Sequence, residues 1–150
     1  MIKNTGKIAS VSSQPSRQRY AGVIKMRKQS KQPISKIQRQ IWEECRRIKN
    51  KKGGVNCYTC IAKDLQGSNK QLGHMWAKAS LPACLKYELD ILEWQCARCN
   101  IWGGGMGADF YKRKLKDLGE KRIKELEKLR QKTVKAYDFY VNLLETYRNL

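Results

Sequence analysis

Apolar residues recur at helical spacing directly after residue 33. They are separated mostly by three or four positions, which places them on one face of a helix. They are Ile37, Ile41, Trp42, Cys45 and Ile48. Ser35 can cap this helix, which we expect to run to about Lys49. The glycines Gly53 and Gly54 then end the segment.

A second helical pattern occupies residues 108–150. Leu115 and Leu118 close its first part, and Gly119 interrupts it. Beyond the glycine the apolar positions are Ile123, Leu126, Leu129, Val134, Tyr137, Val141, Leu144 and Tyr147. This face packs either on the protein's own core or on a second copy of the chain, because its members from residue 134 to 144 keep heptad spacing. A homodimer through the C-terminal helix therefore stays open.

The middle of the chain, residues 55–102, carries shorter patterns. Residues 71–76 and 91–95 read as short strands, and Pro82 marks a break between them. A helix is expected to begin near Cys96 and to end by Gly103. The chain thus predicts an α+β fold in three parts. Residues 1–33 form an arm, residues 34–106 a helix plus a core, and residues 107–150 a C-terminal helical extension.

Charge points to a polyanionic partner. The chain holds 32 Lys and Arg against 13 Asp and Glu, a net charge of +19, and nucleic acid is the commonest partner of such a chain. Residues 1–33 contain eight basic residues and no acidic one, which predicts a disordered basic arm. There is no apolar run of about 18 residues and no signal-peptide core, so we expect no membrane partner and a cytoplasmic location.

Four of the six cysteines form two C-x2-C pairs. Cys57 and Cys60 make the first pair, and Cys96 and Cys99 make the second. Two facing pairs supply the four thiolates that a structural Zn²⁺ takes in a tetrahedron. A core of about 50 residues buries little apolar surface, so a bound metal ion would add stability that the core lacks. Cys45 and Cys84 are expected to be free thiols.

Two further residues are candidates for catalysis. His74 is the only histidine in the chain and lies between the cysteine pairs, while Asn100 directly follows the last cysteine. If the cysteines close on one zinc ion, both side chains can face one cavity. A neutral imidazole can deprotonate a water molecule, and an amide oxygen suits a hard cation such as Mg²⁺ or Mn²⁺. This combination is typical of phosphodiester hydrolysis.

At these residues the chain resembles a known family. The motif consists of Cys57-x-x-Cys60, Gly73-His74, Gln95-Cys96-x-x-Cys99-Asn100, Gly105, Tyr111, Leu115 and Leu118-Gly119. It resembles the NinG (Rap) recombination proteins of lambdoid phages over roughly residues 34–130. The Cys-x-x-Cys-Asn ending is also similar to that of the endonuclease VII-like resolvases.

The resemblance implies a zinc-stapled ββα core of the His-Me finger (HNH) class, flanked by α-helices. It implies a metal-dependent endonuclease that cuts branched DNA such as Holliday junctions and D-loops, located in the host cytosol if the chain is phage-encoded. In that family His74 corresponds to the general base and Asn100 to the last metal-binding position. HNH proteins often have Asp at the position of Gly73 and Asn at that of Ile91. Asp90 and Asp109 are therefore candidates for a further metal ligand.

Basic residues flank the predicted core on both sides. We expect them to hold DNA phosphates. They are Arg39, Arg46 and Arg47 before the core, and Lys112, Arg113 and Lys114 after it. Two other functions remain: a non-catalytic zinc-ribbon protein that binds DNA as an accessory of recombination or transcription, and an RNA-binding basic protein.

Overall fold

The computed structural model describes residues 31–51, 55–133 and 136–150. The described part of the chain forms one compact unit. The predicted basic arm, apart from residues 31–33, lies outside the described residues. Within this unit, no helix is both long and apolar enough to cross a membrane.

Helix α1, Ile34–Lys51, is the predicted amphipathic helix. It begins two residues earlier than a helix capped by Ser35 would, so the prediction that Ser35 caps it is wrong. The carbonyl of Pro33 accepts hydrogen bonds from the amides of Lys36 at 3.0 Å and Ile37 at 3.3 Å. A proline, which has no N–H, fits the start of a helix, where amides have no partner in the preceding turn. The glycines expected to end this segment, Gly53 and Gly54, lie outside the described residues.

A two-stranded antiparallel sheet lies at the centre. Strand β1 is Gln71–His74 and strand β2 is Leu92–Gln95, and Leu72 lies opposite Trp94. Both predicted strands are present but shorter than expected. The chain enters β2 from a single 3₁₀ turn at Leu89–Ile91, in which the Glu88 side chain accepts a hydrogen bond from the Asp90 amide.

Helices complete the described chain. Helix α2, Ala83–Lys86, follows Pro82 between the strands. A π-helical turn, Arg98–Trp102, carries the last cysteine and ends at Gly103, as the sequence predicts. Helix α3, Gly107–Leu129, is broken at Gly119, whose φ of 78° is one that side chains disfavour. Helix α4, Ala136–Arg148, is separate, so the predicted C-terminal helix has a second break after Leu129.

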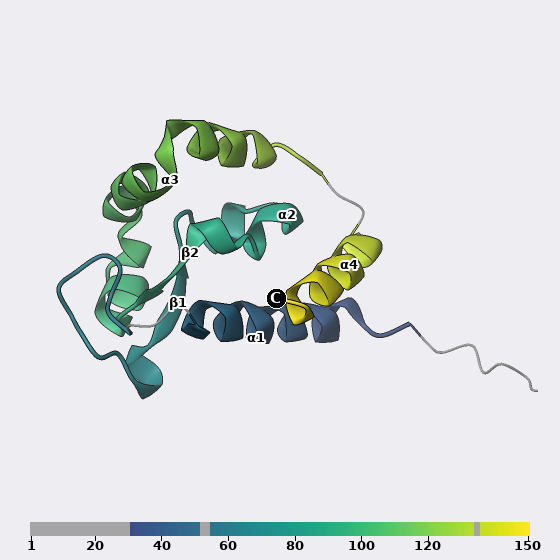
Figure 1. The fold of residues 1–150 in the computed structure, drawn as a ribbon, viewed down its shortest axis with the longest axis horizontal. Helices are drawn as coiled ribbons and strands as arrows, with labels where there is room; N and C mark the ends of the chain where they lie inside the picture. Colours follow the sequence, from purple (N-terminus) through teal and green to yellow (C-terminus); the bar gives the residue numbers. More distant parts are fainter. Residues whose placement is uncertain (1–30, 52–54, 134–135) are drawn as a thin grey trace, which may run out of the picture. The chain divides into compact units, whose positions relative to one another are not determined.

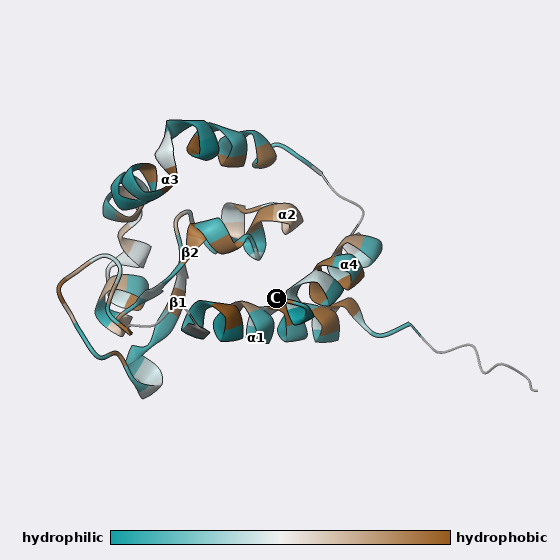
Figure 2. Ribbon diagram, in the orientation of Figure 1, coloured by the Kyte–Doolittle hydropathy of each residue, from teal (hydrophilic) through white to brown (hydrophobic). Residues whose placement is uncertain are grey.

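Helix α4 packs along α1 within the same chain (Figure 1). Tyr140, Leu144 and Tyr147 of α4 are buried in one cluster with the apolar face of α1, and the Tyr147 hydroxyl donates to the Tyr87 carbonyl at 2.7 Å. Figure 2 shows both helices with hydrophobic and hydrophilic segments, as amphipathic helices have. Of the described residues of the apolar face considered for a dimer, Leu144 is buried in this cluster, and Tyr137 and Val141 are partly buried against it. A homodimer through the C-terminal helix stays a prediction.

A buried ion cluster ties three elements together. Lys49 of α1 and Lys114 of α3 both donate to Glu93 Oε1 of β2, at 2.8 Å and 2.6 Å. The two lysines are 4% and 3% exposed. Removing Glu93 would leave two buried ammonium groups without this carboxylate, which is far more costly than losing a surface ion pair. This cluster fixes the sheet between α1 and α3.

Candidate functional site

The four paired cysteines converge on one point. The sulfur atoms of Cys57, Cys60, Cys96 and Cys99 all lie within 4.8 Å of one another. Two of them, on Cys60 and Cys96, are 3.8 Å apart. A tetrahedral zinc ion with Zn–S bonds of about 2.3 Å places its sulfurs roughly 3.8 Å apart. The cluster therefore has the ligand set and the spacing to hold a structural zinc ion.

Backbone amides donate to two of the four sulfur atoms. The amide of Cys96 donates to Cys57 Sγ at 3.3 Å, and the amide of Ala62 donates to Cys60 Sγ at 3.4 Å. Burial disfavours the Cys57 thiolate, but hydrogen bonds from Cys96 and Thr59 outweigh it and lower the pKa of Cys57 to about 6. Burial raises the pKa of Cys99 to about 12, and the pKa of Cys60 is raised as well, so Cys57 is the first of these thiols to lose its proton. A thiolate, rather than a thiol, is the form that ligates a metal.

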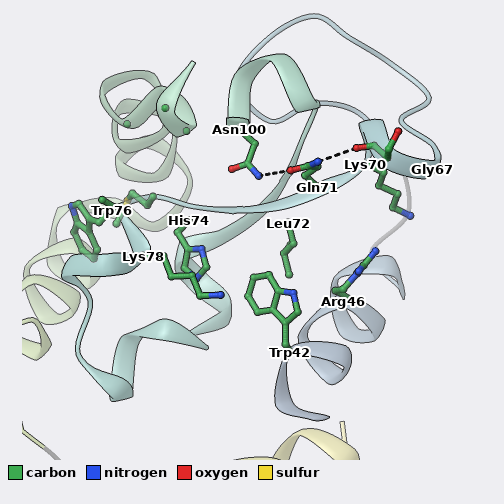
Figure 3. Close-up of a pocket in the computed structure, with 16 residues that line it drawn as sticks. Trp42, Arg46, Gly67, Lys70, Gln71, Leu72, His74, Trp76, Lys78 and Asn100 are labelled. Carbon is green, nitrogen blue, oxygen red and sulfur yellow. Dashed lines mark hydrogen bonds between the residues drawn. The ribbon is translucent and has the colours of Figure 1, made fainter. Parts of the chain in front are cut away.

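A pocket of about 600 Å³ lies where α1, β1 and the turn after β2 come together. Trp42 and Arg46 come from α1, His74 from the end of β1, and Asn100 from the π-helical turn (Figure 3). The structure therefore brings His74 and Asn100 to one cavity, as the sequence predicts. It also adds side chains that the sequence analysis did not assign to the site: Trp42, Lys70, Gln71, Trp76 and Lys78.

His74 is held by two contacts. Its Nε2 lies 2.9 Å from the carbonyl oxygen of Lys86. A carbonyl only accepts, so the proton of the neutral ring is on Nε2 and Nδ1 keeps its lone pair. The imidazole also stacks on Trp42, with ring centroids 5.4 Å apart and planes 6° from parallel. Burial, followed by the charges of Lys78 and Lys86, lowers the pKa of His74 despite the hydrogen bond. The ring is therefore neutral at pH 7.

Packing explains why glycine occupies position 73, where HNH proteins often have aspartate. A Cβ on residue 73 would lie 2.0 Å from Gln95 Oε1 and 3.1 Å from Asn100 Oδ1. Gln95 is fully buried, and its Nε2 donates to Thr59 Oγ1 and to the Gly105 carbonyl, both at 2.9 Å. The Gln95 amide thus fills the space where an aspartate side chain would begin. A side chain at residue 73 therefore fits only if Gln95 moves.

Gly73→Ala is expected to destabilise the protein by about 2 to 5 kcal/mol, because Gln95 must give up two buried hydrogen bonds to make room. Chemical denaturation measures the change. Gly107→Ala is the matched control. A Cβ there meets nothing closer than the Met75 carbonyl oxygen at 3.9 Å, and alanine favours the helix. Equal stability of the two variants would contradict the packing argument.

The pocket provides few ligands for a divalent cation. Among its described lining residues there is no carboxylate. Asn100 offers Oδ1, while its Nδ2 donates to Gln71 Oε1 at 3.0 Å. The further ligands considered from the sequence lie elsewhere, since Asp90 pairs with Arg122 at 2.8 Å and Asp109 is exposed on α3. Mg²⁺ usually takes one or two carboxylates, so these residues alone do not fit a resident divalent ion.

Cations dominate the pocket instead. Arg46, Lys70 and Lys78 line it, and Figure 3 shows them on different sides of the cavity. Lys78 Nζ lies 4.7 Å from the Trp42 ring centroid, and Lys70 Nζ lies 4.6 Å from that of Trp94. Aromatic faces hold ammonium groups in place without neutralising them. With a neutral His74 in their midst, these residues suit an anion such as a phosphodiester.

The six predicted DNA-binding residues have different surroundings. Arg46 lines the pocket, and Arg39 and Lys112 are exposed. The others are engaged within the chain. Arg47 donates to the Tyr147 carbonyl at 2.7 Å, Arg113 donates to the Tyr58 carbonyl, and Lys114 is buried on Glu93.

Comparison with known proteins adds no assignment. No family model matches the chain, no curated protein matches it, and no solved structure matches it. What the site does must therefore be argued from its own geometry.

The sequence indicates the positions of two further residues of the site, Gln95 and Trp42. Gln95 directly precedes Cys96, so closing the cysteine cluster places it in the interior. Trp42 lies four positions before Arg46, which puts both on one side of α1. Lys70 and Lys78 had no such signal, because loops between short elements bring them to the pocket.

Proposed function

We propose that the chain is a zinc-stapled DNA endonuclease in which His74 is the general base. The observation that carries this proposal is the contact of the His74 ring with the Lys86 carbonyl, which leaves the second ring nitrogen for a water molecule. His74 Nε2 is committed to the Lys86 carbonyl, and none of the described residues partners Nδ1. A neutral base with one free nitrogen in a cationic pocket is the arrangement that hydrolysis of a phosphodiester needs.

The proposed chemistry uses the chain's own residues. Arg46, Lys70 and Lys78 hold the scissile phosphate and its neighbours. His74 Nδ1 takes a proton from a water molecule as its oxygen attacks phosphorus. The bond from phosphorus to the leaving oxygen then breaks, and that oxygen takes a proton from solvent, while the cations stabilise the charge on the phosphate oxygens. The resemblance to NinG proteins and other HNH nucleases adds Mg²⁺ or Mn²⁺, for which Asn100 is the candidate protein ligand in the pocket.

The cysteine cluster has a structural role in this proposal. We assign it Zn²⁺ because four thiolates leave no open coordination position. The cluster joins the loop of Cys57 and Cys60 to the end of β2, which in turn sets Gln95 and Asn100. The strand pair followed by the turn with Asn100 supports a ββα core of the His-Me finger class.

Branched DNA is the proposed substrate. A nuclease that reads branches recognises the shape of DNA and the positions of its phosphates rather than base edges. The cations of the pocket, together with exposed Arg39 and Lys112, suit such recognition. The resemblance to NinG proteins points to the same substrates, and a pair of cuts across a four-way junction would require two copies of the chain.

The test is a cleavage assay on junctions, D-loops, single strands and linear duplexes of scrambled sequence, with and without Mg²⁺ or Mn²⁺. We expect cutting to follow branch structure and to be nearly independent of sequence. Equal cutting of linear duplex, or cutting confined to one short sequence, would reject branch selectivity. Binding of all these DNAs without any cutting would favour the alternative, a non-catalytic zinc-ribbon DNA-binding protein. The shortage of metal ligands in the pocket is the observation that favours that alternative.

A further inference from the structure

We propose that Trp42 is a positioning residue for His74. Its indole holds the imidazole in the plane in which Nε2 meets the Lys86 carbonyl and Nδ1 is left for water. The inference rests on the proposed function, because it assumes that His74 is the base. Trp42 lies on α1, which precedes the two strands and the cysteine cluster in the chain.

A single hydrogen bond does not fix a histidine ring. The bond from Nε2 to Lys86 sets the position of one ring edge, but the ring can still tilt about that contact. A flat neighbour removes this freedom. The indole of Trp42 lies nearly parallel to the imidazole, with planes 6° apart. Figure 3 shows the two rings side by side in the pocket, one from α1 and one from β1. Together the two contacts define both the edge and the plane.

The indole is itself held in place. Lys78 Nζ lies 4.7 Å from the centre of the Trp42 ring. Tyr87 meets the indole edge-on, with centroids 6.5 Å apart and planes at 69°. Lys78 is also one of the two charges that act on His74, the other being Lys86 on α2. Arg46 adds a third charge to the pocket from α1.

The C-terminal helix extends this support. Ile41 and Cys45, on either side of Trp42 in sequence, are fully buried in the cluster that α4 covers. Packing against Tyr140 and Leu144 therefore sets the rotation of α1 about its axis, and that rotation decides where the indole lies. The position of the base thus depends on a pair of helices outside the strands that carry it.

The sole histidine gives a direct readout. NMR of the imidazole nitrogens reports the tautomer and the pKa of His74 without interference from another histidine. We compare Trp42→Phe, which keeps a flat face, with Trp42→Leu, which keeps an apolar side chain but has no ring. Trp102→Leu is the matched control, because Trp102 is 81% exposed and does not line the pocket.

In Trp42→Leu we expect the share of the Nε2–H tautomer to fall and the pKa of His74 to rise toward 6.5, since the ring gains contact with water. Cleavage should lose about 10- to 100-fold in kcat with little change in KM, because a misplaced base affects the chemical step more than binding. Trp42→Phe and Trp102→Leu should stay within about threefold of wild type.

An unchanged tautomer and pKa in a folded Trp42→Leu would overturn the proposal. So would a loss in Trp42→Phe as large as that in Trp42→Leu, which would indicate a need for volume rather than for a ring. If the tautomer shifts as expected but the wild-type protein cuts none of the DNAs, the positioning stands and the proposed function fails. Thermal unfolding and zinc content verify that each variant is folded.

Discussion

His74→Ala should abolish DNA cleavage while zinc content and DNA affinity stay close to wild type. The loss expected from removing a general base is about 10²- to 10⁴-fold in kcat. No other histidine exists to take the proton, and none of the described residues lining the pocket is a carboxylate that could replace it. Single-turnover cleavage of a four-way junction measures the effect, and binding is measured separately on the same DNA.

The pH dependence gives this prediction a second measurement. Cleavage needs the neutral ring, so activity should fall as the pH drops through the pKa of His74. Burial, with the charges of Lys78 and Lys86, lowers that pKa below the ordinary 6.5. The acidic limb of the rate profile should therefore lie below pH 6.5. Added imidazole should restore part of the activity to His74→Ala. If His74→Ala cuts at nearly the wild-type rate, His74 is not the general base.

Cys96→Ser should release the metal and unfold the centre of the protein. Among the described residues, the cluster around the cysteines buries one aliphatic side chain, that of Leu65, and only three more apolar residues besides the cysteines pack partly buried against it: Val55, Ala62 and Met106. So little apolar surface does not stabilise the loops without a metal, and zinc binding supplies about 10 to 16 kcal/mol in small zinc domains. We expect one zinc ion per chain in the wild type by elemental analysis and less in the variant, with a lower temperature of unfolding.

Cys84→Ser is the matched control for the metal. This thiol lies outside the cluster, is partly exposed and donates to the Leu129 carbonyl at 3.5 Å. Its replacement should leave the zinc content at the wild-type level. A strong chelator should reproduce the Cys96→Ser defect in the wild type and in Cys84→Ser alike. Wild-type protein purified without chelators and found free of zinc would contradict the prediction.

Local patterns determined much of the fold. The spacing of apolar residues along α1 follows from the geometry of a helix and can be found in the sequence alone. The C-terminal end of α1 was therefore predicted to within two residues. The break at Gly119 followed from one residue type. The cysteine pairs also act locally, because two C-x2-C loops can present four sulfurs to one point. The convergence of His74 and Asn100 followed from closing that cluster.

Tertiary structure decided what the residues of those elements touch. A sequence pattern shows that α4 has an apolar face, but not that the face is covered by α1. It shows that Lys114 is basic, but not that this side chain is buried in an ion pair with Glu93. Trp42 stacks on His74, which lies 32 positions further along the chain. Gln95 occupies the space beside residue 73 that a side chain would need, and these two residues are 22 positions apart. Such contacts depend on how whole elements pack together, and local periodicity carries no information about that.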